Sequence, residues 1–120
     1  MKSYTDIKQS KKLAEILPIE SADMCYRAYM KEGGISDYLV SLCPHQFASW
    51  VSVPCWSLAA LVEQLPAIEG GRPLISINLN GECDMSYIHA LTVGSPYVHA
   101  SNLLDACYEM IIKLREKDLL

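Results

Sequence analysis

The sequence predicts an α+β protein, a single domain built from a mainly antiparallel sheet and three helices. Two observations lead to this class. Apolar residues recur with helical spacing near the start, the middle and the end of the chain. Between these stretches apolar and polar residues alternate, as they do in half-buried strands. We expect the central and C-terminal helices to pack on one face of the sheet.

The first half of the chain predicts one helix and two strands. Either Thr5 or Asp6 can cap a helix that runs to about Leu17, where a proline follows. Residues 24–31 alternate in polarity and predict a strand with one buried side. Residues 38–42 fit a short helix or a strand, and we favour the strand.

The middle of the chain predicts a short apolar helix. Residues 47–53 alternate as a strand and lead into residues 54–66, which begin and end with proline. Ser57 can cap the helix through its hydroxyl. Ala59 and Ala60 widen its apolar stripe, so we expect this helix to be buried on more than one side, with strands around it. The stripe is Leu58, Leu61, Val62 and Leu65.

Residues 74–79 are the clearest predicted strand and are followed by the turn pair Asn80-Gly81. A two-residue loop would set acidic residues opposite the aliphatic face of this strand. A three-residue loop over 80–82 avoids this mismatch, so we predict that loop or an equivalent bulge. Two sets of side chains then share an inward face, Ile75, Ile77 and Leu79 with Cys83, Met85 and Tyr87.

The end of the chain predicts a strand and the longest helix. In the predicted register His89 continues the inward row, and residues 97–101 form a last short strand. Asn102 then caps a helix, with Asp105 placed three residues later as in a capping box. The apolar stripe of this helix is Leu103, Ala106, Cys107, Met110, Ile111 and Leu114.

Composition limits the classes of partner. The chain has 120 residues, of which 51% are hydrophobic, which suits one domain over residues 1–120. Its net charge is −4 and its one cluster of cations lies within residues 8–12, so we predict no nucleic-acid partner. No stretch resembles a secretory signal or is long enough to span a bilayer. We therefore predict a cytoplasmic protein with no membrane partner.

Five cysteines are present, and none forms a C-x-x-C pair. An odd number without such pairs indicates reduced thiols, most of them small core residues. A metal site could be drawn from Cys43 and His45 with Cys55 or Cys83. The spacing of Cys43 and His45 is tight for two ligands of one tetrahedral ion, and there is no second close pair. We predict no metal and no other cofactor.

Three stretches together resemble a known group of proteins. They are YTDIKQSKKLAEILP at residues 4–18, PCWSLAAL at 54–61 and DACYEMIIKL at 105–114. In these stretches the chain is similar to a family of small uncharacterised proteins from gut Bacteroidales, often carried on prophages and conjugative elements. The resemblance implies an accessory protein of a mobile element. It brings no catalytic residue to this chain.

One set of residues has the composition of a catalytic site. Cys55 precedes a predicted helix, where the helix dipole favours a thiolate, while His89 and His99 lie on later strands. A cysteine nucleophile, a histidine base and an orienting histidine are similar to the layout of papain-like and NlpC/P60-type hydrolases. The sequence around Cys55 does not reproduce the nucleophile motif of those families. The alternative is a core cysteine with two structural or surface histidines.

We predict first a non-enzymatic interaction protein that binds another protein, or a second copy of itself, through an exposed part of the sheet. The seven tyrosines are many for this length, and some must lie on sheet faces. A small cysteine hydrolase is the second prediction, with Cys55 as nucleophile, His89 as base and His99 as orienting group.

Overall fold

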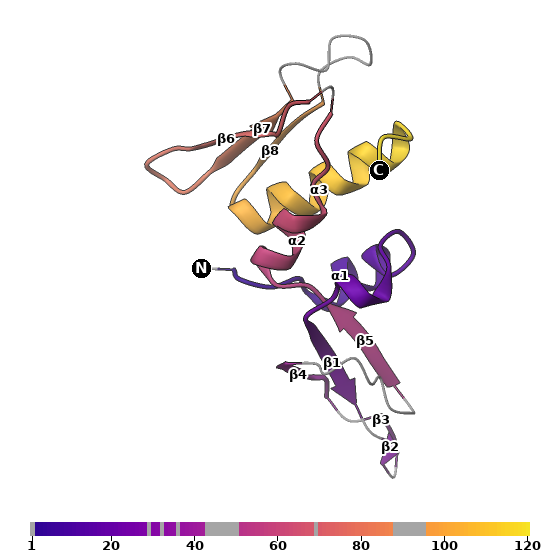
Figure 1. Ribbon diagram of the computed structural model, residues 1–120. Coiled ribbons are helices and arrows are strands. Elements are labelled where there is room, and N and C mark those ends of the chain that lie inside the picture. The colour runs from indigo at the N-terminus through magenta and orange to yellow at the C-terminus, as the bar shows by residue number, and fades with distance from the viewer. Residues whose placement is uncertain are drawn as a thin grey trace. The chain divides into compact units, whose positions relative to one another are not determined.

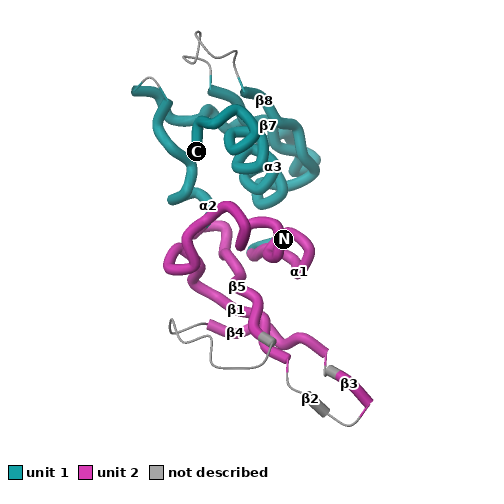
Figure 2. Tube along the Cα trace, turned by 90° about the vertical axis from the view of Figure 1, so that its right-hand side faces the viewer, with its two compact units in different colours: residues 1–3, 61–120 teal, residues 4–60 magenta. Residues whose placement is uncertain are grey.

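The computed structural model describes residues 2–28, 30–31, 33–35, 37–42, 51–68, 70–87 and 96–120. Its residues group into two compact units, one of residues 4–60 and one of residues 1–3 and 61–120 (Figure 2). The described residues form three α-helices and two three-stranded antiparallel sheets, which confirms the α+β class. The organisation as a single domain stays a prediction.

The unit of residues 4–60 holds a three-stranded sheet with β1 at its centre (Figure 1). Both neighbours of β1 run antiparallel to it. Pro54 lies in β5, an edge strand of this sheet, and edge strands tolerate the missing backbone N–H of proline. The predicted strand over 38–42 is confirmed as β4. The strands are β4 (Leu39–Leu42), β1 (Met24–Ala28) and β5 (Val51–Cys55).

Two short strands, β2 (Met30–Lys31) and β3 (Gly34–Ile35), form a separate antiparallel pair. The predicted strand over 24–31 is thus divided between β1 and β2. Gly33 has a φ of 91° at the turn between β2 and β3, a conformation that glycine adopts without strain.

Helix α1 (Ile7–Leu13) opens this unit and packs on β5. Asp6 is its N-cap, and Gln9 completes a capping box with bonds of 2.8 and 3.1 Å between side chain and backbone. The helix ends at Leu13, earlier than the predicted Leu17, and a 3₁₀ turn (Ile19–Ser21) follows. On one face of the sheet, Tyr26, Val53 and Cys55 form a buried cluster.

Helix α2 (Leu58–Gln64) begins as predicted, since the Ser57 hydroxyl accepts a hydrogen bond of 3.2 Å from the Ala60 N–H. The boundary between the two units falls inside this helix, after Ala60. Leu61 is buried, whereas Val62 is 40% exposed. The expectation that this helix is buried on more than one side is wrong, because Ala59 and Val62 are exposed on the opposite side.

The unit of residues 61–120 is a three-stranded antiparallel sheet covered by one long helix (Figure 1). Strand β7 (Cys83–Ser86) is central, between β6 (Leu74–Ile77) and β8 (Tyr97–Ala100). Helix α3 (Leu103–Glu116) packs on β7 and β8. Strand β6 is therefore the edge strand on the side away from β8.

The register of the β6–β7 hairpin confirms the predicted alignment of faces, since Ile75 lies opposite Met85 and Ile77 opposite Cys83. The three-residue loop spans 79–81, one residue earlier than predicted. The Asn78 N–H donates to the Glu82 carbonyl at 2.9 Å, and the Gly81 N–H donates to the Asn78 carbonyl at 3.0 Å. Gly81 has a φ of 85°, as the last residue of such a loop requires.

Helix α3 is capped as predicted, with the Asp105 N–H donating to the Asn102 side chain at 2.8 Å. Its buried face is the predicted stripe with Leu104 in place of Leu103. Burial of β6 differs from the prediction: Ile75, Ile77 and Leu79 are exposed. The reason is that α3 packs mainly on β7 and β8, so among the described residues no helix covers the aliphatic face of the edge strand.

Candidate functional site

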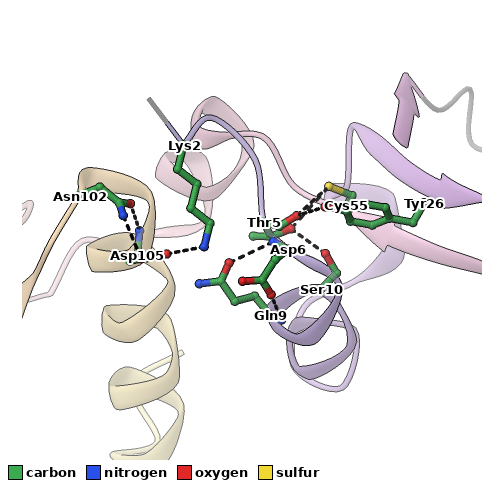
Figure 3. Close-up of polar contacts among 9 residues, drawn as sticks. All are labelled: Lys2, Thr5, Asp6, Gln9, Ser10, Tyr26, Cys55, Asn102 and Asp105. Atoms are coloured by element: carbon green, nitrogen blue, oxygen red, sulfur yellow. Dashed lines mark hydrogen bonds and ion pairs between the residues drawn. The ribbon is translucent and has the colours of Figure 1, made fainter. Parts of the chain in front are cut away.

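Cys55, the predicted nucleophile, lies in a closed polar network at the end of β5 (Figure 3). Its side chain has no exposed surface. The Cys55 thiol donates to the Thr5 carbonyl at 3.4 Å and accepts from the Thr5 hydroxyl at 3.6 Å. The thiol is thus held within the network and faces no solvent.

Thr5 is the centre of this network. Its backbone N–H donates to the Trp56 carbonyl at 2.9 Å, and its hydroxyl accepts from the Trp56 N–H at 3.1 Å. The same hydroxyl lies 2.7 Å from the Ser10 hydroxyl, and the Thr5 carbonyl accepts from the Tyr26 hydroxyl at 2.7 Å (Figure 3). These bonds join the start of the chain to β5, β1 and α1. A buried network whose polar groups are all hydrogen-bonded makes a fold rigid, so the role of this network is structural.

The electrostatics of the network disfavour a thiolate at Cys55. Burial, which penalises the charged form, raises the pKa of the Cys55 thiol above its ordinary value. Burial likewise raises the pKa of Tyr26 to about 12. A nucleophilic cysteine needs a lowered pKa and an accessible sulfur. The environment of Cys55 provides neither.

His99, the second predicted residue, lies on the exposed side of β8, with about half of its side chain accessible. Asp84 on β7 is its cross-strand partner. The Asp84 carboxylate accepts from His99 Nδ1 at 2.7 Å and from the Tyr97 hydroxyl at 2.5 Å. The other ring nitrogen of His99 lies 3.6 Å from the Glu82 carboxylate. We call Glu82, Asp84, Tyr97 and His99 the His99 cluster.

The carboxylates of the His99 cluster set its protonation. The hydrogen bond to Asp84 raises the pKa of the His99 imidazole, and the bond from Tyr97 is the largest cause that lowers the pKa of Asp84. All members are well exposed, so solvent screens the pairing. An imidazolium with both nitrogens beside carboxylates is a poor general base. The cluster is better suited to holding β7 and β8 in register.

A groove of about 490 Å³ runs between β8 and α3, and His99 and Tyr97 lie on one wall of it. Glu109, Ile112 and Lys113 of α3 form part of the opposite wall. The Lys113 ammonium donates to the Tyr97 carbonyl at 2.8 Å and so occupies one backbone acceptor of β8. None of the residues that line the groove is a buried nucleophile, and the lining holds no cluster of metal-ligating side chains.

Neither unit brings the predicted catalytic residues together among its own contacts. The Cys55 sulfur lies in the buried network around Thr5, whereas the His99 ring contacts Asp84 and Glu82. His89, the third predicted residue, lies outside the described residues, as does Cys43. Within the parts of the chain that the structure describes, no group of three His, Cys, Asp or Glu side chains can hold a metal ion.

Strand β6 presents an exposed row of apolar side chains. All four residues of the strand are exposed. We call the apolar residues of the strand and its turn the β6 edge: Leu74, Ile75, Ile77 and Leu79. Ile75 is 41% exposed and Ile77 is 56% exposed, although both follow the alternation of a buried strand.

The backbone of β6 also offers groups for pairing. Asn78 and Glu82 form a hydrogen-bonded pair. Because such pairs alternate along an antiparallel ladder, Ser76 and Leu74 also point their backbone groups at β7. The N–H and carbonyl groups of Ile75 and Ile77 then point to the outer side, where no described strand pairs with β6. This side has the donors and acceptors that a further strand needs.

Sequence patterns missed three features of the structure. Thr5 was considered only as a possible helix cap, since nothing in the sequence indicates that it contacts Trp56, 51 residues away. The pairing of Asp84 with His99 follows from the register of β7 and β8, which the sequence between these strands does not determine. The exposure of the β6 edge depends on where α3 crosses the sheet, which periodicity does not encode.

No protein-family model matches the sequence, and the searches of curated proteins and of solved structures found no match. Nor does any helix in the described residues have the length and apolar character needed to cross a membrane.

Proposed function

We propose that the chain is a non-enzymatic interaction module that binds a polypeptide strand along the β6 edge. The observation that carries this proposal is an edge strand with every residue exposed, whose aliphatic face and outward backbone groups are both uncovered in the described residues. Recognition by strand addition uses these two elements: backbone hydrogen bonds give affinity and alternate side chains give specificity.

The composition of the β6 edge supports a binding role rather than incidental exposure of apolar side chains. Natural edge strands are protected from pairing by lysine, proline, bulges or a covering segment. Residues 74–79 contain no charged residue and no proline. Ile75 and Ile77 have the β-branched shape that packs well across strands. An edge left open in this way is suited to a partner strand.

The hydrolase alternative has less support. It requires an accessible thiolate at Cys55, and the thiol is buried with a raised pKa. His99 is engaged with two carboxylates, and His89 lies outside the described residues. The module is therefore proposed to act by binding, without a cofactor.

We place the module in the cytoplasm, as an accessory protein of a mobile genetic element whose partner is a protein and not nucleic acid. Cys55, Cys83 and Cys107 are buried thiols, which agrees with a reducing compartment. The net charge of −4 gives no support to binding of a phosphate backbone. The mobile-element role rests on the sequence resemblance alone.

A photo-crosslinking experiment in living cells tests the binding role. A benzophenone amino acid replaces Ile77 on the edge strand β6 or, as a matched control, Tyr97 on the edge strand β8; the two positions are 56% and 51% exposed. We expect a crosslinked polypeptide from position 77 and little from position 97. No protein crosslink from position 77, or equal crosslinking from both, overturns the proposal.

A further inference from the structure

We propose that the strand that covers the β6 edge belongs to a second copy of this chain, paired antiparallel with the first and with Ser76 on the twofold axis. This inference rests on the proposed function and names its partner. In this arrangement Ile75 of each copy lies opposite Ile77 of the other.

The hydrogen-bonding pattern of β6 allows this register and excludes a shift by one residue. The outward N–H and carbonyl groups belong to Ile75 and Ile77, because Ser76 directs its own toward β7. With Ser76 on the axis, Ile75 of one copy and Ile77 of the other become a hydrogen-bonded pair. Every outward group of these two residues then finds a partner in the second copy. A shift by one residue would set Ser76 opposite Ile75 and lose this match.

The side chains of β6 are symmetric about the same residue. The order Ile75-Ser76-Ile77 reads alike in both directions, so an antiparallel pair of copies sets isoleucine opposite isoleucine and serine opposite serine. Apolar β-branched pairs across strands are favourable. Because directly opposed residues lie on the same face of a sheet, the half-exposed isoleucines of both copies form one apolar row.

Charge favours the antiparallel orientation. The uncharged residues 74–79 lie between Arg72 at the start of β6 and Glu82 after the turn. An antiparallel pair brings the Arg72 end of one copy toward the Glu82 end of the other, whereas a parallel pair would bring like charges together. In such a twofold contact both copies use the same surface. The β6 edge of each copy is then occupied, so the assembly ends at a dimer.

The size of the contact sets the expected affinity. A contact made by one strand and its turn falls in the small class of interfaces, those that bury less than about 1,200 Å² in total. Contacts of this size dissociate readily, so we expect a dimer with a dissociation constant of about 10–100 µM. Dimer formation must therefore be measured over a range of protein concentrations.

Cysteine crosslinking tests the register. In a non-hydrogen-bonded antiparallel pair the two Cα atoms are about 4.5 Å apart, within the reach of a disulfide. Ser76→Cys should form a disulfide between copies under mild oxidation. Leu74→Cys is the control on the same strand and face: in this register the two copies of residue 74 are separated by about 13 Å along the strands, so no disulfide is expected. The wild-type protein measures the background from native cysteines.

Sedimentation analysis of the purified chain supplies the second measurement. We expect a monomer near 1 µM and a dimer near 1 mM, with Ile75→Lys weakening the dimer about tenfold or more. Val62→Lys, at a position of similar exposure on α2, should leave it unchanged. A wild-type monomer at every concentration, or equal disulfide yields from Ser76→Cys and Leu74→Cys, overturns the second copy as partner. If position 77 then still crosslinks to a different protein in cells, the binding role stands and only its partner is wrong.

Discussion

Met85 of β7 lies directly opposite Ile75 of β6, yet Met85 is fully buried and Ile75 is 41% exposed. The two side chains share one face of one sheet. The difference arises because α3 packs on β7 and β8, and β6 lies beyond it. Burial within this face thus stops at the edge strand, and the uncovered aliphatic row is the basis of the proposed binding role.

Replacing Thr5 with valine should destabilise the unit of residues 4–60. Valine keeps the shape of threonine but removes the hydroxyl that accepts from the Trp56 N–H and contacts Ser10. Leaving a buried donor without its acceptor costs about 1–3 kcal/mol. Urea unfolding measures the change, with Ser3→Ala at an exposed position as the control. Equal midpoints for Thr5→Val and the wild type would show that Thr5 is not the centre of the network.

The Cys55 thiol should resist alkylation in the folded protein. Its burial excludes the reagent, and its raised pKa lowers the thiolate fraction at a given pH. Mass spectrometry of the Cys55 peptide after iodoacetamide treatment should show strong protection that urea abolishes. Rapid labelling of Cys55 in the folded state would instead support the hydrolase.

The His99 imidazole should titrate above its ordinary pKa of 6.5, because Asp84 stabilises the protonated form. Its raised pKa means that the pair contributes most below about 6.5, and that this contribution is lost as pH rises through the folded pKa of His99. The lowered pKa of Asp84 means that the contribution is also lost when pH falls well below 3.8. The pairing therefore stabilises the fold most between these limits.

Nuclear magnetic resonance titration of the His99 ring measures this pKa directly. Asp84→Asn removes the acceptor charge and should lower the His99 pKa toward 6.5. Glu109→Gln, a carboxylate that contributes less to the His99 pKa, is the matched control and should change it less. A His99 pKa that is the same in Asp84→Asn as in the wild type would contradict the pairing.

Asn102 should contribute measurably to the stability of the unit that contains α3. Its side chain accepts from the Asp105 N–H at 2.8 Å and donates to the Asp105 carboxylate at 2.9 Å. Loss of an N-cap side chain costs about 1 kcal/mol, so Asn102→Ala should lower the urea midpoint. Asn102→Asp keeps a capping oxygen, though it sets a second carboxylate beside Asp105. A midpoint for Asn102→Ala equal to that of the wild type would argue against the cap.

The sequence predicted those features that neighbouring residues determine. The cap at Asn102, the start of α2 at Ser57 and the shared face of Met85 and Ile75 all depend on short spacings. Contacts made at long range were not predictable in this way. The bonds of Thr5 to Trp56 and the limit of α3 coverage at β7 are set by packing that a single sequence does not reveal.

The candidate site follows the same division. His99 was correctly expected on the strand beside the hairpin, while its pairing with Asp84 needed the register of β7 with β8. Cys55 was considered a nucleophile because it precedes a helix. Its burial against Thr5 depends on where the N-terminal segment lies. For the β6 edge, the alternation of Ile75 and Ile77 correctly indicated a strand and wrongly indicated burial.

The most direct test of the binding role is amide hydrogen exchange along β6 at increasing protein concentration. In dilute solution the outward amides of Ile75 and Ile77 should exchange rapidly, while the Ser76 amide is protected by β7. As the concentration rises toward about 1 mM, Ile75 and Ile77 should become protected and Ser76 should change little. Protection of Ile75 and Ile77 already in dilute solution, or rapid exchange at every concentration, would contradict an open edge that a second copy covers.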